Sequence, residues 1–252
     1  MLKKTYLLLI LALSTLSLLA QPKITVAVTA NMQYAMQELI AEFNKTDKTK
    51  IDVVLGASGK LTQQIQNGAP FDIFISADKE FPQKLANNKL TLEAPKVYAQ
   101  GLLVLWSVKP NIQPANDLKL LLGSNIKNIA IANTKTAPYG SAAEAILKKY
   151  GLYDKVSSKL VTGESISQTS QFIATQNADI GFTAKSIVIS KEMQGKGKWV
   201  ELNSQHYPPI EQSAVLLQHA KQNNEAAARK FYNFLYSAKA KAIYNKFGYI
   251  VK

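Results

Sequence analysis

The chain has 252 residues, no cysteine and a formal net charge of +13. Without cysteine it can form no disulfide framework, thiol nucleophile or thiolate metal site, and it cannot carry a lipid anchor on cysteine. The charge is almost all lysine, with no basic run longer than two residues and no interleaved aromatic side chains. This pattern argues against a nucleic-acid-binding surface and favours a diffuse positive field that can steer a small anion or an acidic partner.

The first 20 residues have the features of a secretory signal. Lys3 and Lys4 precede a leucine-rich run over 7–19, and Ala20 provides a small residue at the expected cleavage point. The apolar run is shorter than the ~20 residues that a membrane-spanning helix needs. We therefore expect an exported chain that is free in the periplasm, with enough residues left for one large or two small domains.

The exported part begins with a predicted strand over 23–28, followed by small and polar residues at 29–31. Apolar residues then recur at i, i+3, i+4, i+7, i+8 and i+11 from Met32 to Phe43. This spacing predicts an amphipathic helix that begins where the strand ends.

The same arrangement follows again. An apolar run over 51–55 ends in a Gly-Ala-Ser-Gly turn, helical spacing resumes at Leu61 and Ile65, and a third strand is predicted over 71–75. Two strands joined by a helix imply a parallel βαβ unit. Ligands of such sheets lie beyond the carboxyl ends of the strands, where helix N-termini present unpaired N–H groups. Ser58 stands at that place.

Ser58 has two interpretations from the residues alone. Its hydroxyl and the amides after it could hold an anion, or it could simply cap the helix. A nucleotide-binding loop is excluded, because that motif requires Gly at Val54 and Ser or Thr at Leu61. Small polar residues close the strands at 29–31, 58 and 76–78 alike, and this repetition favours a pocket lined with hydrogen-bond donors.

The middle of the chain continues the alternation of strands and helices. Strands are predicted over 102–106, 129–132 and 179–183. Ser141 and Ser165, each followed by Glu or Gln three residues later, predict capping boxes at the starts of two helices.

The last part of the chain has predicted strands at 199–202 and 214–217 and helices from Asn224 and Ser237. Neither His206 nor His219 stands beside acidic clusters, so no metal site is predicted. No nucleophile-elbow motif is present.

Four segments stand out together: the strand end at Asn31, the Gly-Ala-Ser58 turn, the run from Gly68 to Asp78, and the tail Tyr244-Asn-Lys-Phe-Gly-Tyr. With them the chain resembles the family of periplasmic molybdate-binding proteins of ABC uptake systems, over essentially the whole exported part. The resemblance implies an α/β, two-lobed periplasmic binding protein fold of type II, in which each lobe is a mixed, mostly parallel sheet flanked by helices. The expected lobes are 21–101 plus 208–252, and 102–207.

The resemblance also implies the ligand contacts. Carried over position by position, they are Asn31 with Ala30 beside it, Ser58, Tyr139 or the adjoining Pro138, and Ile166. The chain departs from the family pattern twice. Asn31 stands where many members have Ser, and Ala184 stands where some members place a Tyr on the ligand, so Tyr139 is expected to supply the phenol.

The implied function is high-affinity binding of molybdate or tungstate between the lobes and delivery to an inner-membrane ABC permease. We expect a monomer without a cofactor, enzymatic activity or nucleic-acid partner, with molybdenum held only as the oxyanion and not by direct protein–metal ligands. The alternatives are a binding protein for sulfate, phosphate or a small organic acid, and a secreted α/β hydrolase. Phosphate would need an acceptor carboxylate, for which Asp78 is the candidate, although we expect Asp78 to cap a helix.

Overall fold

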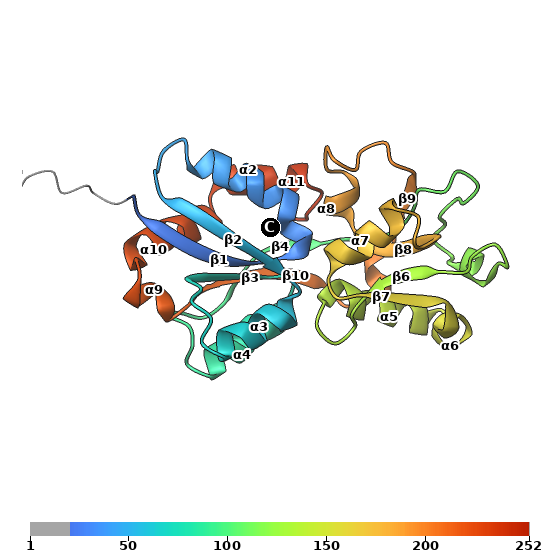
Figure 1. Ribbon diagram of the computed structural model, residues 1–252, viewed down its shortest axis with the longest axis horizontal. Coiled ribbons are helices and arrows are strands. Elements are labelled where there is room, and N and C mark those ends of the chain that lie inside the picture. The colour runs from blue at the N-terminus through green and yellow to red at the C-terminus, as the bar shows by residue number, and fades with distance from the viewer. Residues whose placement is uncertain (1–20, 252) are drawn as a thin grey trace, which may run out of the picture.

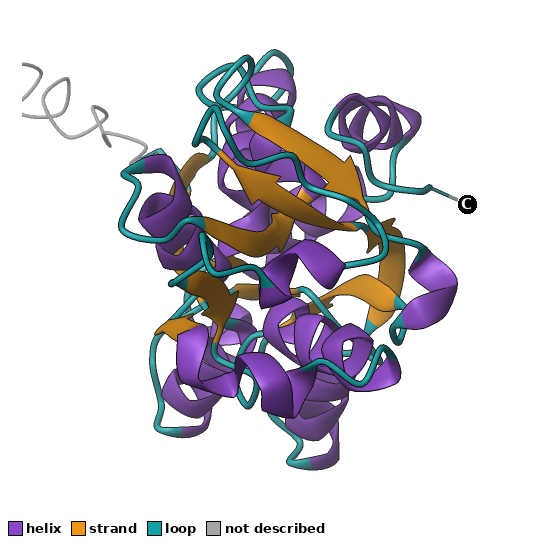
Figure 2. Cartoon of the chain, turned by 90° about the vertical axis from the view of Figure 1, so that its right-hand side faces the viewer, coloured by secondary structure: helices purple, strands orange, loops and turns teal. Residues whose placement is uncertain are grey.

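The computed structural model describes residues 21–251, which form two α/β lobes side by side (Figure 1). The predicted secretory signal at 1–20 lies outside these residues. Within them, no helix is long and apolar enough to cross a membrane. Each lobe has a sheet of five strands with helices on both sides (Figure 2). The fold is therefore the two-lobed type II fold that was predicted.

The sheet of the first lobe has the strand order β2-β1-β3-β10-β4. Strands β1, β2 and β3 are parallel, and β10 runs antiparallel to both β3 and β4. The bounds are β1 Lys23–Thr29, β2 Lys50–Gly56, β3 Ile73–Ser76, β4 Lys96–Gly101 and β10 Ile210–Leu216.

Alternating side chains in these strands divide the core of the first lobe into two layers. Val26 and Ile75 pack with one set of helices, whereas Ala27 and Phe74 pack with the other. This follows from the period of two in a strand, which sends successive side chains to opposite faces. The first set is α2 Gln33–Phe43, α10 Glu225–Phe234 and α11 Ala238–Lys246; the second is α3 Ser58–Gln66 and α4 Glu80–Asn87, and the short α9 His219–Gln222 precedes α10.

The sheet of the second lobe has the order β7-β6-β8-β5-β9, with β6 parallel to β7 and β8. Helix α5 packs with Ile129 and Ile131 on one face, and Ile173 of α7 packs with Ala130 on the other. The elements are β5 Leu103–Ser107, β6 Ile129–Ala132, β7 Leu160–Gly163, β8 Ile180–Ala184, β9 Lys198–Glu201, α5 Pro138–Lys149, α6 Tyr153–Val156, α7 Ile166–Ala174 and α8 Lys185–Val188, with short 3-10 turns η2 Lys119–Leu122, η3 Ser157–Lys159 and η4 Ser204–His206.

The chain passes between the sheets twice. It leaves the first sheet at Gly101 and enters the second at Leu103, and it returns between Glu201 and Ile210. The C-terminal helices therefore pack on the first lobe, on which the chain also begins.

Of the two predicted capping boxes, the one at Ser141 is wrong, and at Ser165 the serine cap is confirmed while the Gln168 side chain accepts from the Glu164 N–H instead. Helix α5 begins at Pro138, so Ser141 lies inside it and donates from Oγ to the Pro138 carbonyl at 2.9 Å. Proline is well suited to the first turn, where its missing N–H is not needed. Ser165 does cap α7, since its Oγ accepts from the Gln168 N–H at 3.3 Å.

Candidate binding site between the lobes

Four helix starts meet where the two lobes touch. In the first lobe the 3-10 turn η1 (Ala30–Met32) follows β1 and α3 follows β2, and in the second lobe α5 follows β6 and α7 follows β7. The start of α7 contacts η1, and the Gly59 N–H in α3 donates to the Thr136 carbonyl before α5 at 2.8 Å. First-turn N–H groups have no partner within their own helix and carry partial positive charge. Such a junction suits an anion.

Ser58 is the first residue of α3 and is completely buried. Its side chain makes no capping bond; Ala57 occupies the cap position. Instead Oγ accepts from the Ala77 N–H at 3.1 Å and donates to Thr29 Oγ1 at 3.3 Å. The simple interpretation of Ser58 as a helix cap is therefore wrong, because its hydroxyl joins the ends of three parallel strands.

Asn31 lies in η1 next to Ala30, and both residues are buried. The Asn31 Nδ2 group donates to Gln212 Oε1 and to the Tyr249 hydroxyl, each at 2.8 Å. With the amide in this orientation both of its protons are taken. What Asn31 can offer a ligand is then its backbone N–H.

Tyr139 is the second residue of α5 and is 2% exposed. Burial raises the pKa of its hydroxyl well above the usual value and the Asn31 side chain opposes this rise, which places the two groups near each other. The phenol stays protonated at neutral pH and is therefore a donor. The contact between Tyr139 and Asn31 does not have the geometry of a full hydrogen bond, so among the described residues neither the Tyr139 hydroxyl nor Asn31 Oδ1 has a hydrogen-bond partner.

Leaving a buried polar atom without a hydrogen-bond partner costs the folded protein ~1–3 kcal/mol of stability. An unpartnered donor beside η1 is accounted for if an acceptor binds there. Gly101 of the first lobe makes room for the phenol, because a Cβ at this position would collide with the Tyr139 hydroxyl. Pro138, which precedes Tyr139, is only partly buried and lines a neighbouring cleft with Ala77 and Asp78.

Ile166 is the first residue of α7 and is buried in a hydrophobic cluster that includes Ala30 of the first lobe. The next residue, Ser167, donates from Oγ to Gln33 Oε1 across the lobes at 2.8 Å. Ala184, at the end of β8, is completely buried and precedes α8. The five predicted contact residues other than Pro138 are all closed off from solvent.

The lobes are joined by further contacts around this junction. Ser186 Oγ donates to the Asn31 carbonyl at 2.9 Å, and Lys60 pairs with Glu164 at 3.4 Å on the surface. Gly59 has no space for a side chain, since a Cβ would stand 3.0 Å from Thr136 Cα and 2.8 Å from Phe81 Cζ. The lobes can approach this closely because residue 59 is glycine.

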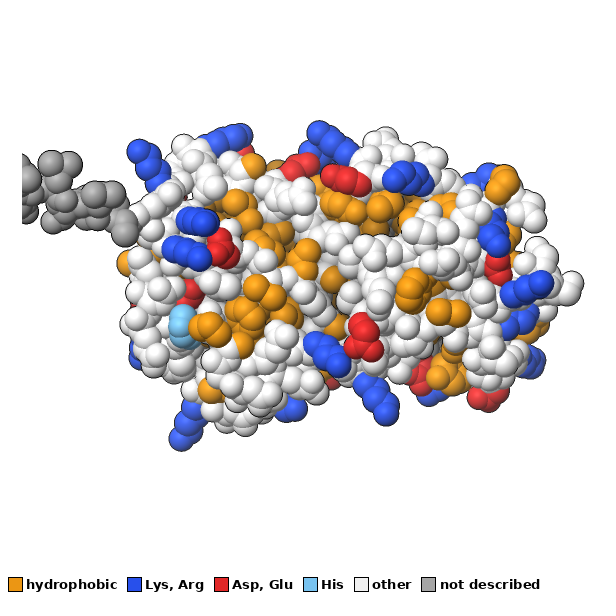
Figure 3. Space-filling model, viewed as in Figure 1, with side chains coloured by type: hydrophobic (Ala, Val, Ile, Leu, Met, Phe, Trp, Pro, Cys, Tyr) orange, Lys and Arg blue, Asp and Glu red, His pale blue; other side chains and the backbone are white. Residues whose placement is uncertain are grey.

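None of the predicted contact residues is charged. The carboxylate of Asp78 stands after the third strand, where it accepts from the Phe81 N–H in the first turn of α4 at 3.0 Å, although Lys79 and not Asp78 occupies the cap position. Burial raises its pKa to about 6. On the outer surface, cationic and anionic side chains are interspersed and form no large patch of one sign on the face in Figure 3. Within residues 21–251, no group of three or more histidine or acidic side chains is placed to hold a metal ion.

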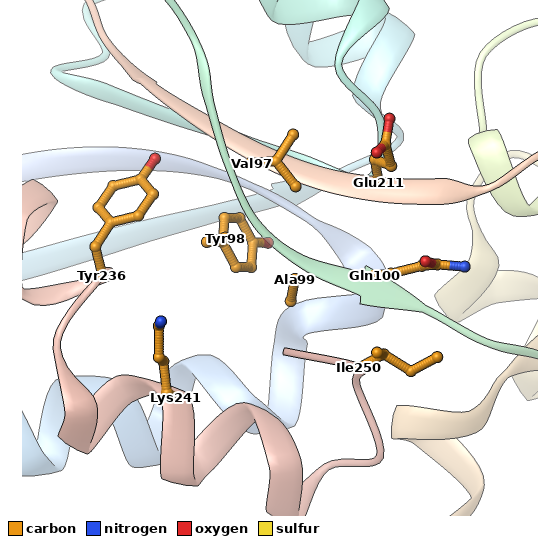
Figure 4. Close-up of a pocket in the computed structure, with 8 residues that line it drawn as sticks. All are labelled: Val97, Tyr98, Ala99, Gln100, Glu211, Tyr236, Lys241 and Ile250. Atoms are coloured by element: carbon orange, nitrogen blue, oxygen red, sulfur yellow. The ribbon is translucent and has the colours of Figure 1, made fainter. Parts of the chain in front are cut away.

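A pocket away from the junction of the lobes lies at the β4 edge of the first lobe (Figure 4). Its volume is 280 Å³, and the lining includes Val97, Tyr98, Tyr236 and Ile250. It contains none of the predicted contact residues. We therefore place the candidate site at the junction of the lobes.

Sequence reasoning missed several residues of this junction. Thr29 could have been found, because it ends β1 directly before Ala30. Gln212 and Tyr249 could not, because they meet Asn31 from 181 and 218 residues away. Ser186 likewise reaches Asn31 from the other lobe.

The family described as bacterial extracellular solute-binding protein matches residues 24–250. The chain is 40% identical to the molybdate-binding protein ModA of Azotobacter vinelandii, over 90% of this chain and 89% of the relative. It is 38% identical to ModA of Rhodobacter capsulatus, over 92% and 90%. The solved structure of the Azotobacter vinelandii periplasmic molybdate-binding protein superimposes with a TM-score of 0.85 at 33% identity, covering 91% of this chain and 99% of that one.

Proposed function

Because the chain belongs to the family of bacterial extracellular solute-binding proteins, we propose that it binds molybdate or tungstate between its lobes and delivers it to an inner-membrane ABC permease. The observation that carries this proposal is the buried Tyr139 hydroxyl, which has no partner within the described chain and lies near Asn31 of the 3-10 turn η1 in the first lobe. The names of the relatives above support the choice of ligand.

Binding follows from the charge of the ion. Molybdate is a dianion without protons at neutral pH, so it can only accept hydrogen bonds. The proposed donors are the Tyr139 hydroxyl and the backbone N–H groups at Ala30, Asn31 and Ile166, with Pro138 shaping the start of α5. The Ser58 hydroxyl joins them if its proton turns from the long 3.3 Å bond with Thr29 Oγ1 to the ion. Each charge-assisted bond contributes ~1.5–3 kcal/mol, and several together offset the loss of hydration without a fixed counter-ion.

Selectivity is proposed to come from size. Sulfate has the same charge and shape as molybdate but is smaller, so it would leave some donors unsatisfied at ~1–3 kcal/mol each. Tungstate is nearly the same size as molybdate and should bind as well. Molybdenum is held only as the oxyanion, and the protein needs no cofactor of its own.

The proposal also covers the localisation of the protein, its oligomeric state and its contact with the permease. We propose a periplasmic monomer, exported by the segment at 1–20, with no catalytic activity. The contacts of Gly59, Lys60, Ser167 and Ser186 across the lobes support hinge closure over the ion. The closed form would present both lobes to the permease, whose acidic residues could meet lysines of this basic chain.

Calorimetric titration of the exported chain, residues 21–252, tests the proposal. Molybdate and tungstate should bind tightly at one site per molecule, and sulfate and phosphate should give little heat. Ser58→Ala should weaken molybdate binding, whereas Ser157→Ala should not, because Ser157 is exposed and its hydroxyl bonds only the Asp154 carbonyl. Equal binding of sulfate or phosphate, or no binding of any of the four ions, would refute the ligand assignment.

A further inference from the structure

The Asn31 backbone carbonyl is held from two sides. It accepts from the Tyr249 hydroxyl at 3.1 Å and from Ser186 Oγ at 2.9 Å. Tyr249 belongs to the C-terminal tail, whereas Ser186 belongs to α8 of the second lobe. A carbonyl oxygen has two lone pairs, so both are used. The Tyr249 hydroxyl also accepts from Asn31 Nδ2 at 2.8 Å. It thus holds both the backbone carbonyl and the side-chain amide of Asn31.

Tyr249 is itself held firmly on the first lobe. The next residue, Ile250, exchanges two backbone hydrogen bonds with Gln100 of β4, at 2.8 and 2.9 Å. The Tyr249 ring packs edge-on against Tyr244 with centroids 6.2 Å apart. Figure 4 shows Ile250 beside the edge strand. Burial raises the pKa of the Tyr249 hydroxyl, so it remains a donor at neutral pH.

The same tail touches the second lobe. Gly248 has a φ of 70°, and a Cβ on it would stand 3.0 Å from Lys185 Cδ and from Ile189 Cδ1. The left-handed backbone and the close approach both favour glycine here. The C-terminal tail thus contacts both the Asn31 turn and α8.

We propose that Tyr249 and Ser186 are positioning residues for the anion site. Tyr249 holds the Asn31 turn in its binding geometry whether the lobes are open or closed, and Ser186 adds its bond only on closure, because it comes from the other lobe. This inference rests on the proposed function and adds to it a link between lobe closure and the ion-binding turn.

Hydrogen exchange without ligand tests the role of Tyr249. Tyr249→Phe should speed exchange of the amides of residues 30–33 about tenfold, the factor expected for a lost buried hydrogen bond. Tyr244→Phe is the matched control, since Tyr244 is also buried in the tail but donates to the Leu235 carbonyl. Equal exchange at 30–33 in the two variants would overturn the role of Tyr249.

Stopped-flow binding of molybdate tests the role of Ser186. Ser186→Ala should raise the dissociation rate three- to tenfold and leave the association rate and the exchange of residues 30–33 without ligand unchanged. Ser190→Ala is the matched control, because the buried Ser190 hydroxyl has no partner in the described part of the chain. Equal dissociation rates for the two variants would overturn the role of Ser186.

A failure of the proposed function looks different. If the unmodified protein binds neither molybdate nor tungstate, the ligand assignment is wrong. The proposed role of Ser186 is then wrong too, because there is no bound state for it to stabilise. The exchange comparison still decides the role of Tyr249, since it needs no ligand.

Discussion

The two lobes contribute to the candidate site in different ways. In the first lobe, Ser58 and Asn31 are already tied into hydrogen bonds with neighbouring strands and with the C-terminal tail. In the second lobe, the Tyr139 hydroxyl is buried without any partner in the described chain. The binding groups of the first lobe are therefore held in place before an ion arrives. The second lobe instead carries a hydroxyl donor for which a bound ligand would provide the acceptor. Substitutions that separate stability from affinity can test this contrast.

Ser58→Ala should produce the largest combined effect. It removes a proposed ligand donor and also the acceptor for the Ala77 N–H. We expect molybdate affinity to fall about 10- to 100-fold, the equivalent of a charge-assisted bond, and the free energy of unfolding without ligand to fall by ~1–3 kcal/mol. Titration and urea unfolding measure the two quantities. A loss of affinity with unchanged stability would mean that the first lobe is not organised through Ser58.

Tyr139→Phe should affect affinity alone. The affinity for molybdate should again fall about 10- to 100-fold, because one donor to a charged ligand is lost. Stability without ligand should stay the same or rise, because the variant removes a buried hydroxyl that has no partner in the described residues. Thermal unfolding with and without molybdate separates these effects. Marked destabilisation of the ligand-free variant would contradict the proposed difference between the lobes.

Gly59→Ala should hinder the meeting of the lobes. Its Cβ would press on the Thr136 backbone at 3.0 Å, and overpacking of this kind destabilises by ~1–3 kcal/mol. We expect molybdate binding to weaken about tenfold and X-ray scattering to show a larger radius of gyration in the presence of the ion. Lys60→Ala serves as a control at the next residue, because its ion pair with Glu164 is exposed. Similar weakening in both variants would show that the effect is not specific to the packing of residue 59 against the other lobe.

Asp78→Asn should change stability in a way that depends on pH. The pKa of Asp78 is raised in the folded protein, from 3.8 to about 6, because burial disfavours the charged carboxylate. The folded state thus binds this proton more tightly than the unfolded state, and the contribution of Asp78 to stability falls as pH rises from about 4 to about 6. Asparagine can still accept from the Phe81 N–H but does not titrate.

Urea unfolding of both forms between pH 4 and pH 7 measures this difference. The variant should gain stability relative to the unmodified protein as the pH rises, by ~2 kcal/mol in all, since each unit of the difference in pKa corresponds to ~1.4 kcal/mol. A difference that does not change with pH would show that Asp78 titrates normally.

Much of the framework follows from local pattern. The spacing from Met32 to Phe43 predicts α2, the apolar runs predict the strands, and Ser165 caps α7 as its position indicates. These features depend on periodicity and on contacts within a few residues, so they can be read along the chain. The same reasoning placed Ser58 and Ile166 at helix starts, where the structure has them.

Other features depended on the tertiary structure. Ser58 looked like a helix cap, but packing turns its hydroxyl to the Ala77 N–H and Thr29. Ser141 looked like a cap, but the helix begins three residues earlier at Pro138. Gln212, Tyr249 and Ser186 reach Asn31 from distant segments and from the other lobe. The sequence alone determined which segments form most of the helices and strands, because short-range spacing sets that pattern. Only the tertiary structure decided which polar groups are satisfied and which await a ligand, because hydrogen bonds between distant segments exist only once both lobes have folded and met.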